Sequence, residues 1–284
     1  MRREWRSPWL KADDYLRHRQ QFRRDKNAAA SHSLIDEVYS NLTSLAWAGD
    51  VRGFSEHEPV HKLATYATHN WLSSVHENQM LDLLRTEIRL DRTRPRIVIK
   101  STDFPHALQA AYEQRDTGDY MDNRYFDHIR QTGVELGNGM VDELGYLMNL
   151  NGDHWVAIVL DFENSAILYG DSMGGKPGED LRETLSWWTH YHSGRKFAYG
   201  ELDVTRQQDG FSCGLLAWNA LAHRSLPHKH QLIDAQEVDD ARLKVLLKVV
   251  DRHNDQVGTF EITMRSSILT HLPLSELRHH QPRL

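Results

Sequence analysis

Residues 144–175, LGYLMNLNGDHWVAIVLDFENSAILYGDSMGG, constrain the fold of this chain more than any other segment. The segment contains three runs rich in β-branched, aromatic and aliphatic residues, separated by Asn-Gly-Asp and by Glu-Asn-Ser, both typical turn compositions. Three short apolar runs joined by tight turns predict neighbouring antiparallel strands at the centre of a sheet. We expect further strands within residues 94–104 and 196–204.

Helical periodicity is found on both sides of this central segment. After Trp71, residues 74–77 match a capping box that starts at Ser74 and ends at Glu77, and apolar residues then recur on one helical face. That face consists of Met80, Leu81, Leu84 and Ile88. Residues 106–131 and 181–191 are also helical in pattern, and a final helix is expected over about residues 235–253. The sum is an α+β domain with one mainly antiparallel sheet flanked by helices.

The pattern divides the chain into three parts. Residues 1–60 mix charges with scattered aromatics, show helical spacing only near Leu34 and Val38, and are interpreted as a basic and aromatic N-terminal extension. Residues 61–255 contain the expected sheet and its helices and form one folded domain. Residues 256–284 are interpreted as a C-terminal tail.

The charge is unevenly distributed. Residues 1–26 carry nine Lys and Arg against four Asp and Glu, whereas the whole chain has a net charge of −6, so the remainder is strongly acidic. The basic stretch could contact an acidic partner, but a solvated arm is the favoured interpretation, and nucleic-acid binding is not predicted.

The composition also bears on the compartment. A chain with one cysteine cannot form an internal disulfide, and neither a membrane-spanning run nor a signal peptide is present in the sequence. These features predict an intracellular protein of the nucleus or cytoplasm.

The single cysteine, Cys213, lies between a polar run and an apolar helical pattern in QQDGFSCGLLAWNAL. A lone cysteine usually behaves as a small buried hydrophobe. Here, however, Ser212 and the helical pattern after it place the thiol at a helix N-terminus, where the partial positive charge favours a thiolate. Gly214 would let other groups approach the backbone closely. The segment therefore has the features of a nucleophilic cysteine.

A base for this thiol is suggested by the central hairpin. The strand that begins at His154 turns near residues 162–164 and returns to Asp171, so the two residues are opposite or within about two places of opposite. Directly opposed Cβ atoms lie ~4.5–5.5 Å apart, within reach of an imidazole–carboxylate hydrogen bond. Such a carboxylate would orient the imidazole, as the third member of a triad does.

A donor for a developing oxyanion could come from the side-chain amide of Gln207, six residues before the cysteine. Gln208 competes for that role. Alternatively, both glutamines only solvate the loop.

Together, HW (154–155), DSMGG (171–175) and QQDGFSCG (207–214) resemble the His, Asp, Gln and Cys motifs of the SUMO/sentrin-specific protease family. These are the ubiquitin-like-protein proteases of the adenovirus-protease clan. The resemblance covers about residues 65–255 and implies a papain-like, adenain-type α+β cysteine protease fold, with residues 61–255 as the catalytic domain.

The resemblance also implies roles for the catalytic residues. Cys213 would attack the carbonyl that follows the C-terminal Gly-Gly of SUMO or a related ubiquitin-like modifier. His154 would act as base and then as acid, and Asp171 would orient it. Gln207 would line the oxyanion hole. The implied activity is that of an isopeptidase that removes modifiers from conjugates, matures their precursors, or does both, and it needs no cofactor.

Substrate-binding residues follow from the same resemblance. Trp71 and Trp155 would form the walls of a tunnel that admits only two glycines, and Gly214 would contribute to the same site. Taken alone, Trp71 is equally consistent with a core aromatic.

Three positions depart from the family's usual pattern. The family often has Asp directly before the cysteine, where this chain has Ser212, and Asn where Asp209 stands. Ser74 replaces an Asp that in relatives can contact the modifier, which leaves the identity of the modifier open.

Two other interpretations compete with the protease. The chain could be a catalytically weak module that binds a ubiquitin-like protein within a larger or mobile-element-linked protein. His228, His230 and the pair at 279–280 could be metal ligands, but without further cysteines or a well-spaced carboxylate no metal site is predicted.

Overall fold

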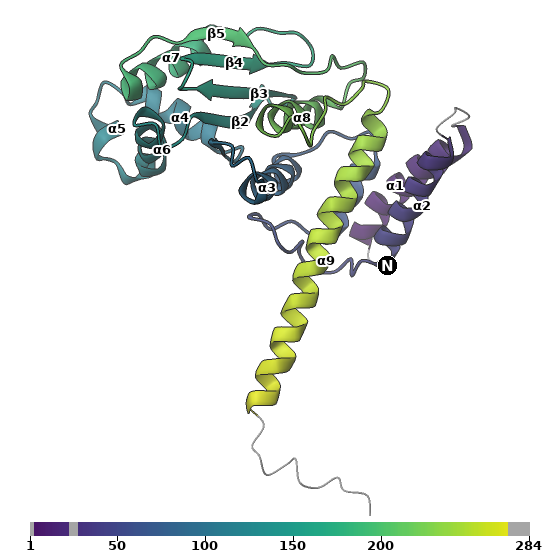
Figure 1. Ribbon diagram of the computed structural model, residues 1–284. Coiled ribbons are helices and arrows are strands. Elements are labelled where there is room, and N and C mark those ends of the chain that lie inside the picture. Colours follow the sequence, from purple (N-terminus) through teal and green to yellow (C-terminus); the bar gives the residue numbers. More distant parts are fainter. Residues whose placement is uncertain (1–2, 23–27, 272–284) are drawn as a thin grey trace, which may run out of the picture.

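The structure is a computed structural model that describes residues 3–22 and 28–271 (Figure 1). Its centre is a sheet of five strands in the order β1-β2-β3-β4-β5. The strands are β1 (Ile97–Ile99), β2 (Glu143–Leu150), β3 (His154–Asp161), β4 (Ala166–Gly170) and β5 (Ala198–Glu201). The three central strands are antiparallel, whereas β1 and β5 each run parallel to their neighbour. The predicted α+β fold with antiparallel central strands is thus confirmed, with parallel strands at both edges.

The turn between β2 and β3 sets where the site begins. Asn151 and Gly152 both have positive φ angles (54° and 85°), and the N–H of Asp153 donates to the carbonyl of Leu150 at 3.1 Å. Two left-handed residues at the centre of a turn match the twist of the flanking strands, and Asn-Gly favours them most. This turn makes His154 the first residue of β3, paired with Leu150.

Helices cover both faces of the sheet, so that β3 is buried along almost its whole length. One face packs against α4 (Phe104–Glu113), α5 (Asp119–Asp122), α6 (Asp127–Gly137) and α7 (Glu179–Ser193), together with the short 3-10 helix η2 (Arg124–Phe126). The other face is covered by α8 (Cys213–Ser225), with α3 (Ser74–Leu90) against α8 and β1, while α9 (Val238–His271) packs on α3 in the same hydrophobic core. Strands buried on both faces are read as nearly continuous apolar runs, as HWVAIVLD is.

Helix α8 carries the cysteine and lies against the sheet as a buried helix. Its sequence CGLLAWNALAHRS has apolar residues on every side, which is typical of a helix without a solvent face. The indole Nε1 of Trp218 donates to the carbonyl of Met80 in α3 at 3.0 Å. The first residue of α8 is therefore fixed relative to both the sheet and α3.

The N-terminal stretch is helical and packed. Helices α1 (Arg3–Phe22) and α2 (Ala28–Ser44), with the 3-10 helix η1 (Val60–Ala67), share one hydrophobic core with α8 and α9. Leu16 and Val38 are fully buried, and Arg19 forms ion pairs with Asp239 and Asp240 of α9. The interpretation of the basic N-terminus as a solvated arm is therefore wrong for its described part.

Two boundaries differ from the sequence-based expectation. Helix α9 begins at Val238 and runs to His271, beyond the expected end near 253, and its second half extends away from the rest of the molecule (Figure 1). The N-terminal cap of α3 is Ser73 with His76 as its partner, and not Ser74 with Glu77. The shift of one residue turns Glu77 toward the protein interior.

Candidate active site

Cys213 is the first residue of α8 and is 4% exposed. The loop before it is held by Asp209, whose Oδ1 accepts hydrogen bonds from the backbone N–H groups of Phe211 and Ser212, both at 2.8 Å. The hydroxyl of Ser212 donates to Asp209 Oδ2 at 2.6 Å. Asp209, four residues before the cysteine, thus fixes the loop that leads to it. Sequence reasoning noted Asp209 only as a departure and missed this structural role.

The surroundings of Cys213 disfavour the thiolate form of its side chain. Burial raises the pKa of the Cys213 thiol. Backbone N–H groups of Trp155, Gly214 and Cys213 itself lower it, but by less. The expected helix N-terminus is present, but its effect on the thiol pKa is outweighed by desolvation. The thiol therefore needs a base to become a nucleophile.

His154 and Asp171 are brought together as the hairpin arithmetic predicted. Strand pairing of Ala157 with Gly170 sets Asp171 two places from the position opposite His154. The imidazole Nε2 lies 2.8 Å from Asp171 Oδ1. Asp171 Oδ1 also accepts from the N–H of Met173 at 2.7 Å, and its Oδ2 from that of Gly175 at 3.1 Å. Both oxygens of the carboxylate are thereby fixed.

Gln207 and Gln208 differ in their surroundings. Gln207 is half-buried, its Oε1 accepts from the hydroxyl of Ser172 at 3.0 Å, and its Nε2 donates to the carbonyl of Asp209 at 2.7 Å. Gln208 is exposed. Only Gln207 is anchored between the loop after Asp171 and the loop before Cys213.

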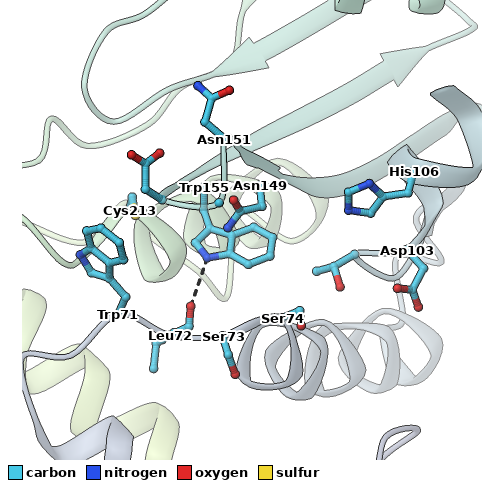
Figure 2. A pocket seen from close by; sticks show the side chains of 13 residues that line it. Trp71, Leu72, Ser73, Ser74, Asp103, His106, Asn149, Asn151, Trp155 and Cys213 are labelled. Atoms are coloured by element: carbon cyan, nitrogen blue, oxygen red, sulfur yellow. Dashed lines mark hydrogen bonds between the residues drawn. The ribbon is translucent and has the colours of Figure 1, made fainter.

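A cleft of about 710 Å³ ends at Cys213 and is flanked by Trp71 and Trp155 (Figure 2). Trp155 is buried, and its Nε1 donates to the carbonyl of Leu72 at 3.1 Å. Trp71 is 53% exposed, and its Nε1 donates to the carbonyl of Gly210 in the cysteine loop at 2.5 Å. Trp71 is therefore not a core aromatic. The other lining residues include Asn149, Asn151, Asp103 and His106.

Glu77 of α3 lies against Gly214, the residue after the cysteine, and was not foreseen as part of the site. Its side chain is fully buried, and a Cβ added to Gly214 would overlap its Oε1. Burial raises the pKa of the Glu77 carboxyl well above its usual range, against a smaller opposite effect of Arg242. Gly214 thus leaves room for Glu77 as well as for the thiol. No sequence signal distinguishes this buried acid from an exposed helical one.

The geometry agrees with a match to a family model. Residues 70–254 match the model described as the Ulp1 protease family, C-terminal catalytic domain. The chain belongs to the Ulp1 protease family. As a member it is a cysteine-type peptidase, and the resemblance noted in the sequence is confirmed. No curated protein sequence matches the chain.

Solved structures of Ulp1 proteases share the fold. The C-terminal Ulp1 protease domain in complex with Smt3, the yeast ortholog of SUMO, is 20% identical, with a TM-score of 0.54 over 76% of this chain and 93% of that one. The SUMO protease Ulp1 with its catalytic cysteine oxidized to a sulfonic acid is 18% identical, with a TM-score of 0.57 over 76% and 93%. The Ulp1-like SUMO protease catalytic domain of Chaetomium thermophilum is 15% identical, with a TM-score of 0.52 over 77% and 88%.

The candidate metal ligands are engaged elsewhere in this Ulp1-family chain. His228 Nε2 lies 3.0 Å from Asp91 Oδ2, and His230 contacts Glu87. Across residues 3–22 and 28–271, no group of three or more His, Cys, Asp or Glu is arranged to hold a metal ion. Residues 279–280 lie outside the described part. Among the helices described, none has the length and apolar character needed to cross a membrane.

Proposed function

We propose that this chain is a cysteine isopeptidase that cleaves after the C-terminal Gly-Gly of SUMO or a related ubiquitin-like modifier. The observation that carries the proposal is the cleft that Trp71, Trp155 and Cys213 line together. Flat indoles close to the backbone leave room for a peptide without side chains, and glycine is the residue that such a passage admits. Smt3 and SUMO are named with the similar structures, which supports this class of partner.

The reaction begins with the transfer of the Cys213 proton to His154. Because Nε2 of His154 is engaged by Asp171, Nδ1 is the ring nitrogen available to the thiol. The thiolate attacks the glycine carbonyl carbon, and the resulting oxyanion accepts hydrogen bonds from the Cys213 N–H and the Gln207 amide. His154 then protonates the leaving amine, and a water activated by the same imidazole hydrolyses the thioester.

The alternative is a weakly active module that retains only binding. The fixed carboxylate of Asp171 supports the enzyme, because both of its oxygens are held in the orientation that a triad requires. A module that only binds would not need an oriented imidazole.

A covalent probe panel tests the proposal. The wild-type chain is incubated with SUMO and other ubiquitin-like proteins, each carrying a C-terminal electrophile after Gly-Gly, with a Cys213→Ala variant as the matched control. We expect one modifier class to become attached to the wild-type chain and none to the variant. Attachment to neither, or equally to both, would overturn the proposal.

A further inference from the structure

The side chain of Arg242 lies beside the cleft, although its helix, α9, carries none of the catalytic motifs. Arg242 is 1% exposed. Its Nε donates to the carbonyl of Tyr66 and its Nη2 to that of Thr65, both at 2.9 Å. Nη2 also donates to the carbonyl of Asn70 at 2.5 Å. One guanidinium thus holds three carbonyl oxygens of the segment that leads directly to Trp71.

The same guanidinium contacts the loop that leads to the cysteine. Its Cζ lies 5.7 Å from the ring centroid of Phe211, within the range of a cation–π interaction. The ring of His69 stacks on Phe211 at 4.3 Å, with 25° between the planes. Phe211 is therefore tied both to Arg242 and to the segment that Arg242 holds.

These contacts connect Arg242, Trp71 and the cysteine loop in a closed series along one side of the cleft. Arg242 binds Asn70, Asn70 precedes Trp71, and the indole of Trp71 donates to Gly210. Gly210 precedes Phe211, whose ring contacts Arg242. Every link is a hydrogen bond, a peptide bond or a ring contact, so a shift of the guanidinium displaces both segments together.

A buried cation needs strong partners, because leaving its N–H groups unsatisfied is costly. Burial lowers the pKa of Arg242, and within the described part of the chain no carboxylate forms an ion pair with it. The carbonyls of residues 65, 66 and 70 satisfy its Nε and Nη2, whereas its buried Nη1 has no hydrogen-bond partner among the described residues. The planar fork of arginine suits such a set of acceptors, whereas the single ammonium of lysine does not.

We propose that Arg242 is a positioning residue that sets the place of Trp71 relative to the cysteine loop, and so the width of the passage for the modifier tail. This inference rests on the proposed function for its substrate, but not for its geometry. Arg242 touches no reacting atom. Its loss should therefore weaken binding of the tail and leave the chemistry of the thiol largely intact.

The test uses Arg242→Lys in the full chain, with Arg252→Lys as the matched control. Arg252 is on the same helix, and its Nη1 donates to the carbonyl of Asp82 at 3.1 Å and to the hydroxyl of Thr86 at 3.2 Å, outside the cleft lining. Backbone amide exchange is measured by mass spectrometry. We expect faster exchange at residues 65–71 and 207–213 in Arg242→Lys, and near residues 82–86 in the control.

Kinetics separate positioning from general damage. For Arg242→Lys we expect KM for the reactive modifier to rise about tenfold, the usual effect of losing one charge-assisted hydrogen bond, with kcat nearly unchanged. Alkylation of Cys213 by iodoacetamide, which is too small to need the passage, should keep its wild-type rate. Guanidinium ions added to Arg242→Ala should partly restore the wild-type KM.

The outcomes decide between the two claims. Exchange that stays at wild-type rates at 65–71 and 207–213, or that rises throughout the domain, would overturn the role of Arg242. An equal loss of kcat and alkylation rate would do the same. A wild-type chain that reacts with no modifier would refute the proposed function, while the exchange pattern still decides the role of Arg242.

Discussion

Replacing Gly214 with alanine is the sharpest test of how the thiol end of α8 packs. An added Cβ would overlap Oε1 of Glu77, lie 2.8 Å from its Cδ and lie 3.2 Å from Cδ1 of Trp155. Glu77 is fully buried, so its carboxyl cannot move out into solvent to make room. Trp155 is held by its hydrogen bond to Leu72. The added methyl group therefore cannot be accommodated unless Glu77 or Trp155 shifts.

The magnitude follows from two opposing effects. Alanine is favoured over glycine inside a helix by ~0.8–1.0 kcal/mol. Overpacking a well-packed core by one carbon costs typically ~1–3 kcal/mol. Because the new Cβ would overlap Oε1 and also approach Cδ of Glu77, the clash lies in the upper part of that range, about 2–3 kcal/mol, and we expect Gly214→Ala to lower the free energy of unfolding by about 1–2 kcal/mol. For a domain of this size that corresponds to a fall in Tm of roughly 2–8 °C.

A double-mutant cycle with Glu77→Ala identifies the cause. Removing the carboxyl opens the space that the new Cβ needs, so Gly214→Ala in that background should be neutral or stabilising. The coupling free energy between the two sites should then be about 1–3 kcal/mol, the range for residues in direct contact. Thermal and urea unfolding of the four proteins measure it. An equal cost of Gly214→Ala in both backgrounds, or a raised Tm in the wild-type background, would refute the packing argument.

Further variants test the chemistry and the buried acid. Cys213→Ser should abolish cleavage of a modifier fused to a fluorogenic leaving group and keep modifier binding, because a hydroxyl has nearly the shape of the thiol but a far higher pKa; unchanged turnover would exclude the nucleophile. Gln207→Ala should slow the same assay by ~10²–10³-fold with little change in binding, and Gln208→Ala should be nearly silent; the reverse result would shift the loop assignment by one residue. Glu77→Gln should become more stable relative to wild type as pH rises above about 4.3, since the native carboxyl keeps a proton that the unfolded one loses; parallel curves of unfolding free energy against pH would show that Glu77 ionises normally.

The pairing of His154 with Asp171 could be predicted because it depends on local chemistry. The Asn-Gly turn sets the start of β3, and the turn near residues 162–165 sets the return, so counting residues between them fixes the register within two places. The hydrogen bond of 2.8 Å then needs only an imidazole of ordinary reach. Both the apolar composition of residues 154–161 and the spacing of the two turns indicated that His154 starts a strand of the central sheet.

The packing of the N-terminal helices could not be predicted, because α1 packs on η1 and α2 on α9, which follows about 200 residues later in the chain. Helix α1 is rich in charge, and its buried seam includes Ala12 and Leu16, too narrow to stand out in a polar sequence. The charge of the buried Arg19 is balanced by Asp239 and Asp240, which α9 brings to it. A charged residue in a sequence does not reveal whether its partner is water or a distant carboxylate.

The site also combines residues that local sequence places with residues that distant segments bring in. The groups proposed to react lie on or next to adjacent strands or at a helix start, where periodicity and turn residues place them. The surroundings of the site come from other segments: Glu77 from α3 fills the space beside Gly214, and Arg242 from α9 holds the backbone that leads to Trp71. Both side chains are charged residues in amphipathic helices, where solvent exposure is the ordinary expectation. Because Glu77 is buried, its carboxyl keeps a proton. Because Arg242 is buried, its guanidinium donates to backbone carbonyls instead of to water. The burial that raises the pKa of the Cys213 thiol therefore fits the proposal that this thiol reacts only after His154 takes its proton.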